Sequence, residues 1–97
     1  MNDEQFAALK RLWQIANGGS GQCRYVASFL LGLYSGQRFP FDLTNLRALD
    51  TEIVQDCLTV LVMDASRSAA EVHSLLGVPS ERFEQLAEDW GIKECEV

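Results

Sequence analysis

The sequence is poor in the residues that build metal centres and disulfide frameworks. It has one histidine and three cysteines among 97 residues, and no two of the cysteines form a CxxC pair. Zinc sites need closely spaced cysteine and histidine ligands, and disulfide frameworks use even numbers of cysteines. The composition therefore predicts no metal, no cofactor and no disulfide scaffold. Unpaired thiols favour a reducing cytoplasm.

Long apolar runs are also missing. The longest stretches, such as Val60 to Met63, are far shorter than the roughly 20 residues of a membrane-spanning helix. The first residues, MNDEQF, lack the basic region and apolar run of a secretory signal. We therefore expect a cytoplasmic protein without a membrane partner.

Basic residues are scarce as well. Lysine and arginine total 8 against 14 aspartates and glutamates, which gives a net charge of -6. An acidic chain is repelled by phosphate backbones and by anionic lipid. This balance disfavours nucleic acid as a partner. It suits a basic protein partner, or it serves solubility alone.

Hydrophobic residues make up 47% of the chain, which is enough to build one core. They recur at three- and four-residue spacing between Gly, Pro and capping residues, a pattern typical of helices. We predict an all-α fold, a single compact bundle of five or six short helices. The expected segments are 3–16, 22–35, 43–49, 51–64, 68–76 and 80–90. The domain would cover 1–91, followed by a frayed tail at 92–97.

The second and fourth predicted helices are apolar on more than one face. A helix of this kind is usually central in a bundle, so we expect these two at the centre. The stretch VLVM within the fourth could form a strand, but the region is long and lacks Gly and Pro. Truncation of Leu30, Leu61 or Phe83 should destabilise the fold most, by about 2–5 kcal/mol each.

Residues 68–91 have the outline of a helix-turn-helix, with a tight turn at Gly77. Its second helix would face DNA, where recognition needs basic and amide side chains. It offers only Arg82 and Gln85 for that role, among several acids. A DNA-binding regulator is therefore an alternative hypothesis, and a plain αα-hairpin packed on the core is the simpler interpretation.

Four acidic residues lie along that second helix, and two aromatic residues flank a proline earlier in the chain. The acids could bind a basic partner, could imitate a nucleic-acid backbone as an inhibitor, or could simply face solvent. Phe39 and Phe41 could be binding anchors, or could cover the core. The candidate acidic residues are Glu81, Glu84, Glu88 and Asp89.

His73 is the one candidate for acid–base catalysis. It would need a nucleophile such as Cys23 or Cys57, or a carboxylate, beside it in space. No local spacing in the sequence demands such a pair. A small enzyme therefore stays a third hypothesis, against a histidine that only packs or hydrogen-bonds a neighbouring helix.

Five short segments of the sequence carry a resemblance: Gly21-Gln22, Phe29-Leu30-Leu31, Phe41-Asp42-Leu43, Leu49-Asp50 and Glu71-Val72-His73. Through them the chain resembles a family of small uncharacterised proteins found in proteobacteria, their phages and integrative elements. The similarity would span roughly residues 5–90. It implies a bacterial accessory or mobile-element protein, without an assigned activity or functional residues. Together with the acidic charge, it favours a non-enzymatic interaction module that binds a protein partner or forms a homodimer.

Overall fold

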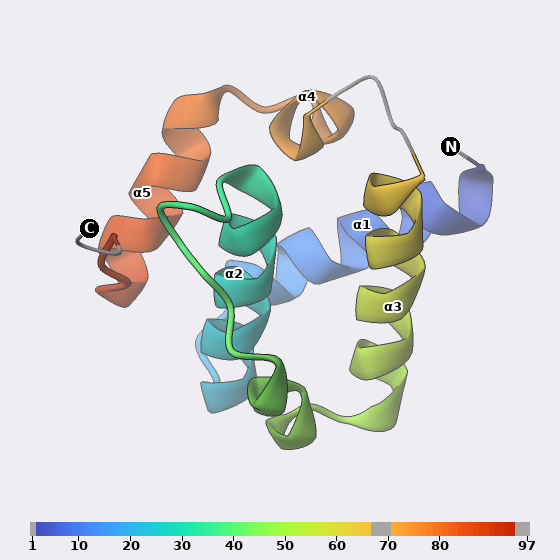
Figure 1. Cartoon of the computed structure of the whole chain (residues 1–97), viewed down its shortest axis with the longest axis horizontal. Coiled ribbons are helices and arrows are strands. Elements are labelled where there is room, and N and C mark those ends of the chain that lie inside the picture. The colour runs from blue at the N-terminus through green and yellow to red at the C-terminus, as the bar shows by residue number, and fades with distance from the viewer. Residues whose placement is uncertain (1, 67–70, 95–97) are drawn as a thin grey trace.

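A computed structural model describes residues 2–66 and 71–94, and these residues are folded as helices joined by short loops (Figure 1). The predicted all-α class is confirmed, and the VLVM stretch is helical. In the described ranges the helices are α1 (Asp3–Ala16), α2 (Gly21–Tyr34), the 3-10 helix η1 (Leu43–Ala48), α3 (Thr51–Ala65), α4 (Val72–Leu76) and α5 (Ser80–Trp90).

Local sequence signals set most helix ends. Asn2 and Gln5 form a capping box in which each side chain accepts from the other residue's backbone N–H, and the acids of the first turn follow. Asp42 caps η1 by accepting from the Thr44 N–H at 2.9 Å. Gly77 and Gly91 end α4 and α5 in the left-handed region, with φ of 72° and 65°.

Two helices, α3 and α5, begin without a side-chain cap, although the sequence predicts Asp50 and Ser80 as their N-caps. Ser80 is the first residue of α5, and Pro79 takes the N-cap position, where a missing N–H costs nothing. Asp50 is the N-cap of α3, but its carboxylate accepts from the Gln22 side chain instead of from its own helix. The expected capping box of Ser68 and Glu71 involves Ser68, which lies outside the described residues.

The core centres on Phe83 of α5. Its fully buried ring stacks between Trp13 of α1 at 4.9 Å and Tyr34 of α2 at 5.1 Å, measured between ring centroids. Leu30 of α2 is also fully buried. The Trp90 indole N–H donates to the Ala16 carbonyl at 2.9 Å, which ties the end of α5 to the end of α1.

The arrangement of the helices corrects one prediction. Both α2 and α3 cross α1, α5 lies on the far side of α2, and α3 stands at the opposite edge (Figure 1). The second predicted helix is central as expected, but the fourth, α3, is peripheral and packs chiefly on α1. Leu61 of α3 keeps 39% exposure, so the expectation of a costly truncation there was wrong.

The ordered chain continues past the expected end at Gly91. The Ile92 N–H donates to the Ala87 carbonyl at 2.9 Å, and the Ile92 side chain packs against the core. Glu94 is held by Arg38. These contacts account for residues 92–94 of the segment that was expected to fray, and residues 95–97 lie outside the described part.

Candidate partner-binding surfaces

The first candidate surface is the outer side of α5, here called the acidic face. The helix is strongly amphipathic, because Phe83, Leu86 and Ala87 are buried on its inner side. This leaves its charged residues at the surface. The acidic face consists of Glu81, Glu84, Glu88 and Asp89.

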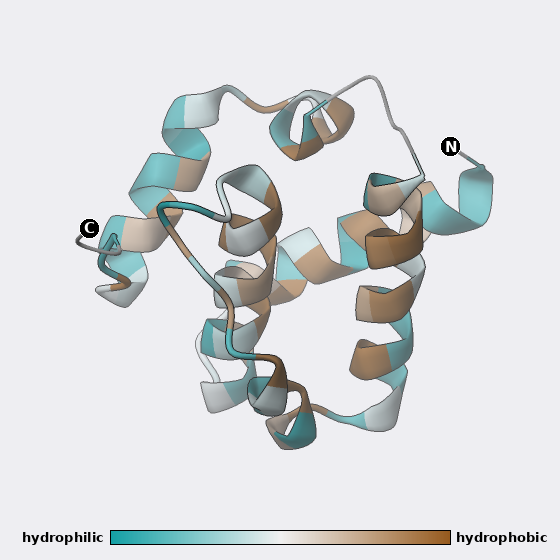
Figure 2. Ribbon diagram, in the orientation of Figure 1, coloured by the Kyte–Doolittle hydropathy of each residue, from teal (hydrophilic) through white to brown (hydrophobic). Residues whose placement is uncertain are grey.

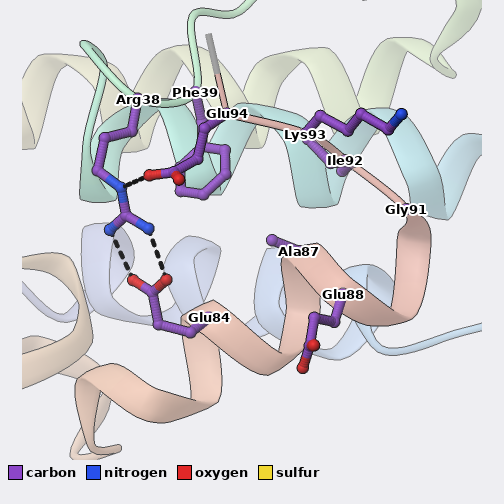
Figure 3. Close-up of a pocket in the computed structure, with 9 residues that line it drawn as sticks. All are labelled: Arg38, Phe39, Glu84, Ala87, Glu88, Gly91, Ile92, Lys93 and Glu94. Atoms are coloured by element: carbon purple, nitrogen blue, oxygen red, sulfur yellow. Dashed lines mark hydrogen bonds and ion pairs between the residues drawn. The ribbon is translucent and has the colours of Figure 1, made fainter. Parts of the chain in front are cut away.

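Glu84 differs from the other members of the acidic face because it forms an ion pair with Arg38. Arg38 lies in the loop after α2 and donates two hydrogen bonds to the Glu84 carboxylate, at 2.8 and 2.7 Å. The Tyr34 hydroxyl donates a third, at 2.6 Å. Arg38 also pairs with Glu94, so one guanidinium joins the loop, α5 and the chain beyond it (Figure 3).

This cluster fixes the charge of its members. Hydrogen bonds from Arg38 and Tyr34 lower the pKa of Glu84 to about 2, and the hydrogen bonds that Arg38 donates to Glu84 and Glu94 raise the pKa of Arg38. Hydrogen bonding to Glu84 raises the pKa of the Tyr34 hydroxyl. Glu84 is thus a bound anion at neutral pH and is already neutralised. The acidic face offers Glu81, Glu88 and Asp89 to a partner.

A shallow pocket of about 310 Å³ lies beside the cluster, and Figure 3 shows its lining residues. Glu88 and Lys93 point away from Arg38, and Phe39 lies beneath the guanidinium. Phe39 is only 4% exposed, and the Arg38 guanidinium carbon is 4.9 Å from its ring centre. The ring therefore belongs to the core, where it supports Arg38, and it is not an exposed anchor.

The two candidate DNA-contacting residues already have partners within the chain. The Arg82 guanidinium carbon lies 5.8 Å from the centre of the Trp13 ring, in cation–π geometry. The Gln85 amide donates to the Asp89 carboxylate at 2.8 Å. Residues 72–90 do form two helices joined by a turn at Gly77. The exposed side of the second helix is nevertheless dominated by carboxylates.

The candidate catalytic residues have other neighbours than one another in the contacts of the described residues. His73 of α4 packs edge-on against the Tyr34 ring, and its Nδ1 is buried without a hydrogen-bond partner among residues 2–66 and 71–94. Cys23 is paired with the Ser20 hydroxyl at 3.1 Å. Burial raises the pKa of Cys57 to about 12, so this thiol stays protonated at neutral pH. Within the described part, no hydrogen bond joins His73 to either thiol or to a carboxylate.

The second candidate surface is apolar and was not expected. Four large hydrophobic side chains stand exposed on η1 and α3: Leu43 at 68%, Leu58 at 49%, Leu61 at 39% and Val62 at 58%. We call these four residues the apolar face. In Figure 2 the hydrophobic side of α3 faces the viewer and the side of α2, and the edge of the helix away from α2 is more hydrophilic.

A groove of about 330 Å³ adjoins the apolar face between the end of α2, the following loop and α3. Phe41 is half-buried in its wall, with its ring edge-on to Phe29 at 5.5 Å. The groove is lined by Phe29, Gly32, Leu33, Gly36, Pro40, Phe41, Leu43 and Leu61. Of the two aromatic residues considered as anchors, Phe41 lies at a surface that a partner can reach.

Sequence reasoning missed Arg38, Glu94 and the apolar face for different reasons. Arg38 is 46 residues from Glu84 and 56 from Glu94, and no local spacing signals such pairs. The apolar face did leave a signal, because α3 is apolar around most of its circumference. That pattern was taken to mean burial inside the chain.

Comparison with known proteins gives a family but no activity. A family model described as a family of unknown function, DUF7673, matches residues 6–91. No curated protein and no solved structure shows a significant match to the chain. No helix in the described ranges is long and apolar enough to cross a membrane.

Proposed function

Since the chain belongs to DUF7673, a family of unknown function, we propose from its surface that it is a non-enzymatic protein-interaction module. It contacts a protein partner through the apolar face of η1 and α3. The resemblance to proteobacterial, phage and integrative-element proteins supports assigning this module to a bacterial or mobile-element system. It acts there in the cytoplasm, as an accessory protein.

The observation that carries this proposal is the exposure of Leu43, Leu58, Leu61 and Val62 on one side of the molecule. Single exposed hydrophobic residues are common, whereas contiguous apolar patches on small proteins mark interaction sites. A groove of about 330 Å³ next to these residues gives a partner side chain a place to insert. The fully buried core of a protein–protein interface is more apolar than the rest of a protein surface and is depleted of charged residues.

The state of the polar groups supports the non-enzymatic part of the proposal. General acid–base catalysis works best with groups that titrate near the operating pH. Glu84, with a pKa near 2, and Cys57, with a pKa near 12, are far from that range. His73 lies among aromatic rings instead of beside a nucleophile.

The acidic face favours protein over nucleic acid as the partner. Glu81, Glu88 and Asp89 are exposed on α5, where a DNA-binding helix would carry basic residues. Arg82 and Gln85 would have to leave Trp13 and Asp89 before they could contact bases. A gel shift at low salt tests this, and tight, salt-sensitive retention of duplex DNA would contradict the proposal.

The interaction itself is tested by immobilising the full chain and two variants in bacterial extract. The wild type should retain a stoichiometric protein, which can include free copies of the chain itself. Leu58→Asp should lose it, because a carboxylate would be buried at the contact. Gln14→Asp is the matched control, since it adds the same charge at an exposed position of α1. Equal retention by all three proteins, or none by the wild type at any salt concentration, would refute the proposal.

A further inference from the structure

We propose that the partner covering the apolar face is the same face of a second copy of this chain, in a two-fold symmetric homodimer. This inference rests on the proposed function, because it takes the apolar face to be the binding surface. In the dimer, α3 packs antiparallel against the partner's α3. Side chains of each copy enter the groove of the other.

The surface has both halves of a self-complementary contact. Leu58 and Val62 project from α3 as a ridge with 49% and 58% exposure. Leu61 and Leu43 of the same face line the neighbouring groove. A two-fold axis brings the ridge of each copy to the groove of the other, as an isologous interface requires.

The groove is built before any partner arrives. A Cβ atom at Gly32 would lie 3.3 Å from the Phe41 Cβ and 3.4 Å from the Phe39 carbonyl oxygen, so glycine lets the loop approach α2 closely. Phe41 is held there by its edge-on contact with Phe29. A wall fixed in this way lowers the entropy that binding would otherwise cost.

The distribution of charge also fits a second copy. Identical residues meet near a two-fold axis, so charges there would repel each other, and the chain carries -6 overall. Residues 57–63 of α3 contain no charged side chain. The acidic face of α5 lies on the other side of α2, away from α3 (Figure 1). The proposed contact therefore joins two acidic chains through residues 57–63 of α3, which carry no charge.

The size of the surface is sufficient for a small dimer. The four side chains of the apolar face present on the order of 300–400 Å² to solvent. A standard interface takes about 800 Å² from each partner, or about one-seventh of the 5946 Å² surface here. The groove walls and the polar residues around them can supply the rest. At about 1.5 Å per residue, the 15-residue α3 is roughly 22 Å long, which allows an extended antiparallel contact.

Dimerisation also explains why a helix as apolar as α3 lies at the edge of the chain. A helix that is apolar on most sides belongs in a core, yet α3 stands at the edge of the chain. Packing α3 against its copy places its outer residues in a shared core.

Sedimentation equilibrium of the full chain from about 1 to about 100 μM tests the proposal at concentrations where homodimers of modest affinity form. We expect a mass of twice 10.8 kDa at the upper end. Leu58→Asp and Val62→Asp should each raise the dimer Kd about 100-fold or more, since each substitution occurs twice in a symmetric interface. Gln14→Asp should dimerise like the wild type.

Circular dichroism shows whether each variant is folded. If either α3 variant unfolds, Leu43→Asp in η1 provides the same test, because this residue is 68% exposed and outside α3. A single-chain mass at about 100 μM, or dimerisation unchanged in all folded variants, would overturn the homodimer. A monomer that still captures a host protein through Leu58 would overturn the homodimer alone. A monomer that captures nothing would overturn the proposed function too.

Discussion

The helices α3 and α5 stand at opposite edges of the molecule and differ in their outer sides. On α5, the apolar residues face the core and the outer side carries Glu81, Glu88 and Asp89. On α3, Cys57, Val60 and Met63 face the core, yet the outer side still carries Leu58 and Val62. The chain thus makes a solvent-facing helix at one edge. The other edge keeps large apolar side chains exposed.

The largest expected effect concerns the buried sides of these two helices. Phe83→Ala should lower the free energy of unfolding by about 3–5 kcal/mol, because it empties the space between Trp13 and Tyr34. Leu61→Ala on α3 should cost about 1 kcal/mol or less in the monomer, because Leu61 keeps 39% exposure. Urea unfolding at about 1 μM, where dimer is sparse, measures both. Equal losses would show that α3 is as deeply packed as α5.

A smaller effect is expected where the chain enters α5. Gly77→Ala should cost about 1–2 kcal/mol, because φ at this residue is 72° and a Cβ is strained there. Space is not the cause, since no atom lies within 4 Å of the added carbon. Gly19→Ala is the matched control, as it too has open space but no positive φ. Thermal unfolding should separate the two variants, and equal midpoints would exclude backbone strain at the turn.

The smallest effect should come from the ion cluster that holds α5 to the loop after α2. The pKa of Glu84 is lowered from 4.5 to about 2 in the folded chain. The stabilisation is therefore complete above about pH 4.5 and is lost as the pH falls towards 2. Both side chains are about 40% exposed, so the gain is under about 1 kcal/mol. Urea unfolding measures the free energy of unfolding at pH 5.5 and at pH 3. The decrease between the two pH values should be smaller for Glu84→Gln than for the wild type.

Glu81→Gln is the control for that measurement, because Glu81 is an exposed carboxylate on the same helix. It should keep the acid sensitivity of the wild type. If Glu84→Gln retained the full loss of stability between these pH values, another carboxylate would be responsible. The fold itself should persist in either variant, because neither substitution changes the buried Phe83 ring or the Trp13 and Tyr34 rings that stack on it.

Much of this fold could be predicted from periodicity and capping residues. The bounds of α1, α2, η1 and α3 fell within one residue of the sequence-based segments, and Gly77 and Gly91 end their helices as expected. Periodicity shows which side of a helix is apolar, but not what covers that side. For this reason the sequence predicts α3 at the centre, although the structure leaves part of its apolar surface exposed to solvent.

The candidate surfaces were less predictable, because they depend on contacts between distant residues. Glu84 was recognised as part of an acidic row, but Arg38, which neutralises it, comes from a loop 46 residues earlier. Phe39 and Phe41 are residues of the same type, and they lie only two positions apart in the chain. One is nevertheless buried, and the other lines the groove. The loop passes close to Gly32, and its path puts the Phe39 ring in the core and the Phe41 ring in the wall of the groove.

The hydrogen bond from the Trp90 indole to the Ala16 carbonyl joins residues that are 74 positions apart. The last turn of α1 is therefore covered only after α5 has been synthesised. A nascent chain arrested ahead of Phe83 would have Trp13 without its stacking partner. Folding of this domain should accordingly be completed only after α5 has left the ribosome.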